Sequence, residues 1–402
     1  MKKRSDWSKL KINTLIKQIS GGTKMAPSSI YIHIPFCVKK CGYCDFLSFS
    51  KSEEIFEEYI IAVLRELQEK KEELSEHKIQ TIFIGGGTPS MLPPKMLGKI
   101  MSFLMDHCNL ADNIEITMEV NPGTMEISKL REWKSMEINR LSIGLQAWQN
   151  RLLKVLGRIH TCEEFIKNYV QARDAGFQNI NLDIMFALPS QTLNDWEETL
   201  ENVLKLRPQH VSAYSLIYED GTPFMEKLRA GKLEETSEEL DRTMYALAKK
   251  MMWDKGYQQY EISNFSLPGF ESQHNCVYWR DEEYWGIGLG SHSYVNGIRY
   301  ANTRDLKKYL ASHGKREAIT EQIEKLSLET QMAEFMFMGL RLTQGVEKDR
   351  FYQRFGEEML HVYEKEISQL IEEGLLDYRK DRICLTERGI DISNYVFEKF
   401  LL

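Results

Sequence analysis

Two patterns of hydrophobic residues alternate along residues 29–218. Short apolar runs, typical of strands buried on both faces, are followed by longer segments whose apolar residues recur three or four positions apart, typical of amphipathic helices. The runs predict six strands, at residues 29–35, 80–84, 114–120, 140–145, 180–188 and 210–218. The intervening segments predict helices at residues 53–76, 94–107, 127–134, 162–175 and 193–206. Because strands that alternate with helices form parallel sheets, this region predicts an α/β fold.

The last eighty residues show a different pattern, which predicts a smaller second module. Residues 327–342 form a predicted helix with Met332, Phe335, Met336 and Leu340 on one face, and further helices lead to a hairpin and a final helix. This order predicts a winged-helix-like α+β domain. Such modules often bind DNA, but this one has no basic stripe, so we favour a domain that docks on the barrel and covers its substrate side.

The chain therefore divides into four parts: a basic extension at residues 1–28, the α/β region at 29–260, a connecting segment at 261–322 and the C-terminal domain at 323–402. The first 24 residues carry seven lysines and arginines against one acid, Asp6. They fit a helix in peripheral contact with a membrane surface, or a transit peptide. A third interpretation is that the native protein starts at Met25. Gly21 and Gly22 lie just before it, and a ribosome-binding sequence of the GGAGG type would be translated as Gly-Gly.

Unusual residues fall where the predicted strands end. Three cysteines follow the first strand, a glycine turn follows the second, and single polar residues mark the next three. In barrel-like βα folds the chemistry lies on the loops after the strands, so these residues predict one shared site. They are Cys37, Cys41 and Cys44, then Gly86, Gly87 and Thr88, then Glu119, Gln146 and Asp183.

The cysteines Cys37, Cys41 and Cys44 have the spacing C-x3-C-x2-C. Iron–sulfur clusters usually take four cysteines, so three on one loop indicate a four-iron cluster with one iron left open to an exchangeable ligand. A zinc site would need a fourth ligand and more often shows paired C-x2-C spacings. Three unrelated buried cysteines would not crowd a loop rich in Gly, Lys and aromatic residues.

The polar residues each have a structural alternative. Glu119 and Asp183 interrupt apolar strands, where a carboxylate is unfavourable unless it is paired, so each could serve a salt bridge or face solvent. Gln146 and Arg158 are similar cases. The glycine turn would let the backbone approach a ligand closely. It is their placement on successive strand ends that favours a functional set.

The cysteine motif resembles the signature of the radical S-adenosylmethionine (SAM) superfamily. This resemblance implies a partial (β/α)6 TIM-like barrel, a [4Fe-4S] cluster on the three cysteines, and SAM on the open iron, cleaved there to methionine and a 5′-deoxyadenosyl radical. It also implies that the methionine end of SAM is contacted by Gly86, Gly87 and Thr88. The amino group or ribose of SAM would be bound by Glu119, together with Gln146, Arg158 and Asp183. Tyr31 would lie beside the cluster.

Within the superfamily, the motifs from Tyr31 to Thr192 resemble the oxygen-independent coproporphyrinogen III oxidase group, which has two branches. The oxidases carry a fourth cysteine at a position that is Phe46 here. HemW-type haem chaperones carry the string H-N-x-x-Y-W, which matches residues 274–279. That resemblance implies a haem site with His274, Tyr278 and Trp279, in which a neutral imidazole is a common iron ligand and Cys276 a second candidate. A turn followed by a packed aromatic pair is the structural alternative.

Residues 285–293 are rich in glycine but lack the G-x-G-x-x-G pattern of a nucleotide-binding turn. By resemblance, this segment closes the site near the cluster. His292 is a candidate pocket residue, although a buried histidine with satisfied hydrogen bonds is the favoured interpretation.

Three functions follow as hypotheses. The first is a haem chaperone that holds the cluster, SAM and haem and passes haem to an acceptor protein; the second is an oxidase that decarboxylates coproporphyrinogen to protoporphyrinogen; the third is a DNA-binding module that senses iron–sulfur status. The net charge of −7 gives no support for a nucleic-acid partner. Seven cysteines, three of them clustered, favour a reducing cytoplasm. The expected partners are a haem or porphyrin, an acceptor protein, and an electron donor such as a flavodoxin or ferredoxin.

Overall fold

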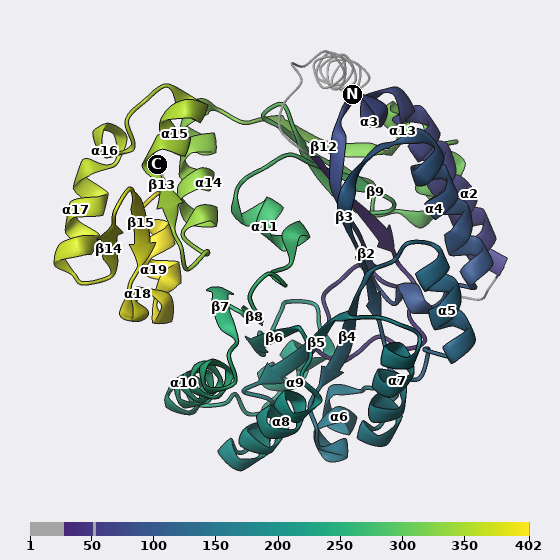
Figure 1. The fold of residues 1–402 in the computed structure, drawn as a ribbon, viewed down its shortest axis with the longest axis horizontal. Helices are drawn as coiled ribbons and strands as arrows, with labels where there is room; N and C mark the ends of the chain where they lie inside the picture. Colours follow the sequence, from purple (N-terminus) through teal and green to yellow (C-terminus); the bar gives the residue numbers. More distant parts are fainter. Residues whose placement is uncertain (1–27, 51–53, 402) are drawn as a thin grey trace.

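Six parallel strands form the centre of the fold in the computed structural model, which describes residues 28–50 and 54–401. They lie side by side in chain order and correspond to the six predicted strands, which confirms the α/β prediction (Figure 1). The second and third are several residues longer than expected. The strands are β1 (Ser28–Ile34), β2 (Lys78–Gly86), β3 (Asn109–Val120), β4 (Arg140–Gln146), β5 (Asn179–Phe186) and β6 (His210–Ser215).

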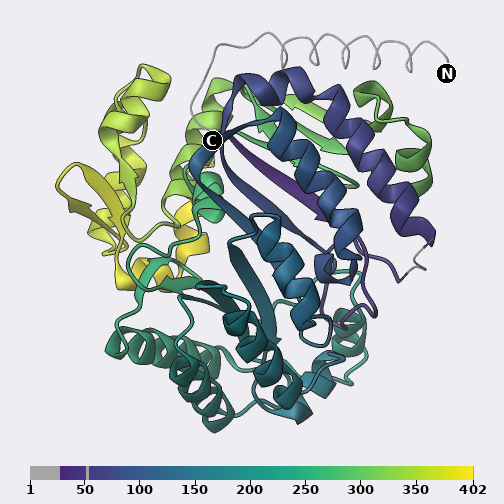
Figure 2. The same cartoon turned by 45° about the vertical axis from the view of Figure 1, so that its right-hand side comes forward.

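Helices cover the outer face of these strands, as Figures 1 and 2 show for α2, α4, α5, α7 and α8. Their starts are set by the sequence: Thr161 and Glu164 form a capping box before α7, and Thr192 and Asp195 form another before α8. The helices of this region are α2 (Glu54–Glu69), α3 (Lys71–Glu76), α4 (Pro94–His107), α5 (Ile127–Ser135), α6 (Asn150–Leu156), α7 (Cys162–Asp174), α8 (Leu193–Leu206), α9 (Pro223–Arg229) and α10 (Glu238–Asp254).

The sheet continues beyond the six predicted strands on both sides. β9 (Tyr284–Ile287) pairs in parallel with β1, and the antiparallel strands β10 (His292–Val295), β11 (Ile298–Asn302) and β12 (Thr320–Lys325) follow it. On the other side β8 (Asn264–Ser266) and β7 (Gln258–Glu261) extend the sheet beyond β6. In the described chain the six strands are therefore the centre of a twelve-stranded sheet, and β1 has neighbours on both sides.

A short helix, α11 (Gln273–Trp279), carries the H-N-x-x-Y-W string. The turn of the structural alternative is therefore wrong, although its packed aromatic residues are present, because the Tyr278 ring lies against His274 and Tyr284. Ser272 caps the helix by accepting a hydrogen bond from the backbone N–H of Asn275. Figure 1 shows α11 between the sheet and the C-terminal domain, where its His274 ring stacks on Phe83 of β2.

The C-terminal domain has its own hydrophobic core, which contains Met332, Phe335 and Met336 as predicted. Its three-stranded sheet has the order β13-β15-β14. The helices and strands follow the order expected for a winged-helix-like module, and Figure 1 shows them to one side of the barrel. They are α14 (Leu328–Gly339), β13 (Val346–Glu347), α15 (Lys348–Phe355), α16 (Met359–Val362), α17 (Glu364–Glu372), β14 (Leu376–Arg379), β15 (Arg382–Leu385), α18 (Glu387–Asp391) and α19 (Ser393–Glu398).

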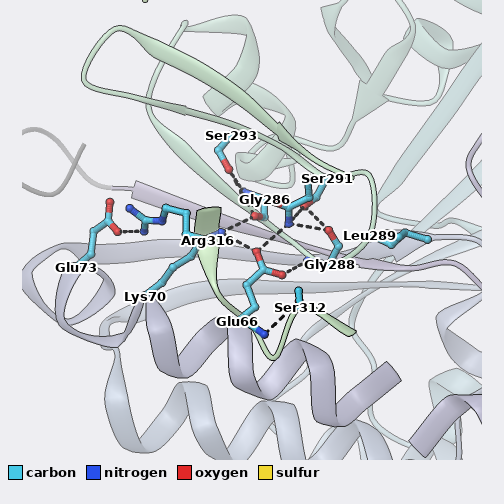
Figure 3. A network of polar contacts seen from close by, with 12 residues as sticks. Glu66, Lys70, Glu73, Gly286, Gly288, Leu289, Ser291, Ser293, Ser312 and Arg316 are labelled. Carbon is cyan, nitrogen blue, oxygen red and sulfur yellow. Dashed lines mark hydrogen bonds and ion pairs between the residues drawn. The ribbon is translucent and has the colours of Figure 1, made fainter. Parts of the chain in front are cut away.

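A buried polar network ties α2 to the segment around Gly288 (Figure 3). The fully buried carboxylate of Glu66 accepts hydrogen bonds from Lys70 Nζ at 2.7 Å, Asn302 Nδ2 at 2.8 Å, Gly288 N at 2.9 Å and Tyr309 OH at 2.7 Å. Because buried charges are costly unless paired and hydrogen-bonded, this complete set of partners stabilises the arrangement. The glycine-rich segment is therefore held in place by the first helix after the cysteine loop.

None of the helices in the described residues is long and apolar enough to cross a membrane. The expectations for the basic extension and for a start at Met25 fall on residues outside the described part of the chain.

Candidate cofactor site at the ends of the parallel strands

The three cysteines of the motif line a single cavity of about 140 Å³ at the carboxyl ends of the strands. All three side chains are half-buried, and a turn in which Cys44 N donates to Cys41 O (3.3 Å) brings the last two together. No three His, Cys, Asp or Glu side chains among the described residues converge as ligands of one ion would. A four-iron cluster makes no such demand, because each thiolate binds a different iron. The thiols therefore fit a cluster better than a mononuclear metal.

His33 of β1 holds the cysteine loop in place through a hydrogen bond. Its Nε2 lies 2.8 Å from the carbonyl oxygen of Leu47, and its Nδ1 lies 3.0 Å from the hydroxyl of Tyr31. Because a carbonyl can only accept, Nε2 carries the proton and Nδ1 accepts from Tyr31. Burial lowers the pKa of His33, which keeps the ring neutral as this arrangement requires. Tyr31 thus acts here through His33, and it is not among the residues that line the cavity.

The glycine turn after β2 packs directly on the cysteine loop. A Cβ on Gly87 would lie 2.6 Å from the backbone oxygen of Phe36, so no larger residue fits without moving the loop. Gly86 has a φ of +115°, a conformation that glycine adopts most readily. Thr88 donates from its hydroxyl to the sulfur of Cys37 at 3.6 Å. Gly86, Gly87 and Thr88 all line the cavity, and part of their role is to shape the cysteine loop.

Arg158 connects the second cysteine to the glycine turn. Its guanidinium donates to Cys41 Sγ at 3.7 Å, to the backbone oxygen of Gly144 at 2.7 Å, and to Asn121 Oδ1. Asn121 in turn donates to the Thr88 hydroxyl at 2.8 Å. Arg158 therefore belongs to the site, as expected from its position after the fourth strand.

Glu119, Gln146 and Asp183 line the same cavity, so the structure brings the predicted polar set together. Asp183 accepts hydrogen bonds from Ser142 and Asn181, and burial raises its pKa. Gln146 has a φ of +71°, a strained conformation for a residue other than glycine. Such strain costs about 1–3 kcal/mol and is concentrated at functional sites. Its side chain accepts a hydrogen bond from Tyr214 at 3.1 Å.

Glu119 has an unusual protonation equilibrium. Burial raises the pKa of its carboxyl from 4.5 to about 7, against the effect of the Gly86 N–H, which donates to it at 2.9 Å. A folded-state pKa above the unfolded value favours folding at low pH, and this contribution is lost as pH rises from 4.5 through 7. The carboxylate therefore destabilises the ligand-free protein at alkaline pH.

We expect Glu119→Gln to stabilise the ligand-free protein at pH 8 and to leave its stability nearly unchanged at pH 5. The gain at pH 8 is at most about 3 kcal/mol, and water in the cavity reduces it by solvating the carboxylate. Urea denaturation of both proteins at the two pH values measures the difference. An equal effect at both pH values would show that the carboxyl does not titrate in this range.

A second, larger cavity of about 470 Å³ adjoins the first and shares Cys44, Glu119 and Asp183 as lining residues. Phe46, which occupies the position of the oxidases' fourth cysteine, also lines both cavities and is 62% exposed. Trp279 lines the larger cavity, and so does Asn275 of the same helix. An open cavity with aromatic walls thus lies directly beside the cysteine site.

His274 and Tyr278, the other two defined residues of the H-N-x-x-Y-W string, do not line this cavity. His274 is 1% exposed, and its Nδ1 is 2.7 Å from the Thr81 hydroxyl. Because Thr81 donates to Ser29, it accepts from His274 Nδ1, so Nε2 is unprotonated and accepts from Tyr278 OH at 2.9 Å. Burial lowers the pKa of His274 to about 3. An iron ion at Nε2 would have to replace the Tyr278 hydroxyl.

The structure contradicts the expectation for His292 and confirms the expectation for Cys276. His292 is exposed, so the interpretation as a buried, satisfied histidine is wrong: its strand, β10, turns this side chain outward. Cys276 is buried as expected for a small apolar residue, and burial raises the pKa of its thiol to about 12, which disfavours the thiolate that a metal ligand requires.

Sequence reasoning missed several residues of the site. Tyr214 lies at the end of β6 and lines both cavities, but the predicted sixth strand continued to residue 218, so the strand-end rule did not mark it. His33 lies inside an apolar run, where its polarity was the available signal. Arg341 reaches the larger cavity from the C-terminal domain, and nothing in the local pattern marks it.

Comparisons with known proteins agree with this geometry. Residues 31–203 match the radical SAM superfamily, and residues 326–392 match the HemN C-terminal domain. The heme chaperone HemW of Lactococcus lactis is 39% identical over 376 residues, which cover 94% of this chain and 98% of that protein. The HemW of Bacillus subtilis is 36% identical over 93% of this chain and 99% of its own. The structure of coproporphyrinogen III oxidase (HemN) from Escherichia coli, at 20% identity, superposes with a TM-score of 0.83 over 95% of this chain and 92% of that one.

Proposed function

Because this chain belongs to the radical SAM superfamily, and within it to the family of the heme chaperone HemW, we propose that it binds haem beside a [4Fe-4S] cluster and SAM and transfers the haem to an acceptor protein. The observation that carries this proposal is the larger cavity. It adjoins the three cysteines, and Phe46 and Trp279 offer it apolar aromatic surface. A planar tetrapyrrole needs such walls, since aromatic contacts supply most of the binding energy of a flat apolar ligand.

The residues of the smaller cavity fit the cluster and SAM. Cys37, Cys41 and Cys44 would hold three irons, and no fourth cysteine lines either cavity in the described chain. When bound, the cluster and SAM supply one-electron chemistry, while the protein orients SAM and excludes water. Glu119, Gln146, Arg158 and Asp183 would orient SAM, with Gly86, Gly87 and Thr88 against its methionine end. Tyr31 would act through His33.

The haem side of the proposal involves all three residues of the string. Trp279 would contact an edge of the macrocycle. His274 would hold Tyr278 in place, and its Nε2 lone pair would become available to iron once the Tyr278 hydroxyl rotates away. We place this activity in the cytoplasm because a cluster of three cysteines needs reducing surroundings. A flavodoxin or ferredoxin is the proposed electron donor.

The second candidate is the oxygen-independent coproporphyrinogen III oxidase reaction. It is favoured by the adjacency of the two cavities, which would place a porphyrinogen beside SAM. Phe46 argues against it, because the oxidases have a cysteine at this position. The likeness to HemN, at 20% identity, concerns the fold and does not distinguish the two functions.

We expect the reconstituted protein to bind about one haem per chain and to form no protoporphyrin from coproporphyrinogen with SAM and reductant. Trp279→Ala should weaken haem binding by about 10- to 100-fold, since a buried aromatic face is worth about 1.5–3 kcal/mol. Absorbance titration measures haem binding by both proteins, and porphyrin fluorescence detects any protoporphyrin formed.

Trp253→Ala is the matched control, because Trp253 is 72% exposed on α10 and lines neither cavity. Equal haem affinity in both tryptophan variants would place the haem elsewhere. Turnover to protoporphyrin without stable haem binding would favour the oxidase instead.

A further inference from the structure

Arg341 is held over the larger cavity by contacts between the C-terminal domain and the barrel domain. It follows α14 in a segment that pairs with β7: Leu342 bridges to Glu261, and Thr343 N donates to Tyr260 O at 3.0 Å. The guanidinium carbon lies 4.4 Å from the centre of the Trp279 ring. Arg341 and Trp279 therefore form a stacked pair in the wall of the cavity where we place the haem.

The guanidinium of Arg341 lacks an acceptor. In the described part of the chain it makes no hydrogen bond or ion pair, and its buried Nε has no partner. Arginines nearby in the same domain differ. Arg350 pairs with Glu282 at 2.8 Å and Arg382 pairs with Glu347 at 2.6 Å. An arginine over a cavity with its donors unused has the geometry of a receptor for an anion.

The carboxyl group of Glu261 is the main charged partner of Arg341, but the two side chains make no hydrogen bond or ion pair in the described chain. One oxygen of this carboxyl group accepts from Ser263 N at 3.0 Å and from Asn264 Nδ2, and the other is buried with no partner. Burial raises the pKa of Glu261, while the positive charge of Arg341 acts on that pKa in the opposite direction. Arg341 therefore interacts with the charge of Glu261 but uses none of its hydrogen-bond donors on it.

A second guanidinium lines the same cavity. Arg140 is 2% exposed, its Nε has no partner, and its one hydrogen bond goes to the Thr117 hydroxyl at a long 3.5 Å. Five carboxylates also line the cavity, of which Asp183 accepts from Ser142 and Asn181, and Glu119 accepts from Gly86. Buried polar atoms without a partner in its wall include both acceptors and donors: one oxygen each of Glu261 and Asn264, and a nitrogen each of Arg140, Trp279 and Arg341. The two guanidinium groups are the cations among them, and an anionic group of a ligand would pair with these.

We propose that Arg341 receives a carboxylate of the bound tetrapyrrole, a propionate, while the Trp279 ring beneath it contacts the adjoining edge of the macrocycle. This inference rests on the proposed haem site and adds to it a residue of the C-terminal domain. Guanidinium groups bind carboxylates with two parallel hydrogen bonds, and stacking on an indole holds the guanidinium plane in position for them. The C-terminal domain then contributes to recognition as well as covering the cavity.

The test compares haem with haem dimethyl ester, whose propionates carry no charge. We expect the protein to bind haem about 10- to 100-fold more tightly than the ester, as the loss of a charge-assisted pair predicts. Arg341→Gln should weaken haem binding by a similar factor and leave the affinity for the ester unchanged. Arg341→Lys should restore part of the haem affinity, because it keeps the charge without the planar fork.

Arg280→Gln is the control, since Arg280 adjoins Trp279 but lines a separate hollow of about 220 Å³. If Arg341→Gln weakens haem and its ester equally, Arg341 only supports Trp279 and the inference is wrong. If the unaltered protein binds the two ligands equally, no propionate is recognised, and this result needs no variant. Failure of the unaltered protein to bind either ligand would overturn the proposed function itself.

Discussion

Cys41→Ser is expected to abolish the iron–sulfur cluster. After anaerobic reconstitution, iron and sulfide should fall from about four per chain to near zero, with loss of the thiolate-to-iron absorbance. The motif provides only three thiolates, so one iron of the cluster already lacks a protein ligand. Loss of a second protein ligand would leave the cluster attached through two irons only, which is too little to hold it. The Arg158 guanidinium, which lies 3.7 Å from the Cys41 sulfur, would be left beside a hydroxyl that stays protonated.

Cys108→Ser is the matched control. Cys108 is also half-buried, but it follows α4 at the opposite ends of the strands and does not line either cavity. We expect this variant to retain its full iron and sulfide content. Equal losses in both variants would indicate a general effect of cysteine removal on folding, and full retention in Cys41→Ser would refute the ligand assignment.

Lys70→Met is expected to destabilise the protein by about 3–5 kcal/mol, because it leaves the buried Glu66 carboxylate without its counter-ion. The two side chains lie 2.7 Å apart, and each is 1% exposed. Glu66 keeps its bonds to Asn302, Gly288 and Tyr309, but these are neutral donors and cannot balance a buried charge. Urea denaturation followed by circular dichroism measures the change.

The chain contains a matched exposed pair, Glu201 and Lys205, with the same four-residue spacing. Lys205→Met should cost no more than about 0.5 kcal/mol, because exposed pairs on helices contribute little. The double variant Glu66→Gln/Lys70→Met should recover part of the loss, since it removes the buried charge and keeps an amide oxygen that can accept from the neutral donors. Similar costs for Lys70→Met and Lys205→Met would show that burial of the pair does not matter.

The centre of the fold was predictable because one physical rule connects sequence to position. Parallel strands meet at a single edge, so Glu119, Gln146 and Asp183, which are far apart in the sequence, had to gather there. The additional strands were missed because they are short: β9 has four residues, and its pairing with β1 depends on contacts between segments far apart in the chain. The helix α11 was missed because its polar and aromatic residues have no clear period.

Residues whose place depends on packing could not be predicted. Arg341 reaches the site because the segment after α14 pairs with β7, a contact between two domains that no local pattern encodes. The burial of His274 likewise follows from the stacking of its ring on Phe83. His292 shows the reverse, since it was expected to be buried but is the one exposed residue of β10, whose other three residues are buried.

The position of β1 has a consequence for synthesis on the ribosome. Its partners are β2, which follows soon after it, and β9, where Ser29 pairs with Tyr284. Until most of the chain has left the ribosome, one side of β1 is therefore an unpaired edge, of the kind that promotes pairing with other chains. The loop that carries the three cysteines emerges early, but its supporting strand gains its second neighbour only late. Nascent chains would thus be most vulnerable to aggregation in that interval, and a cluster inserted during translation would enter an incompletely supported loop.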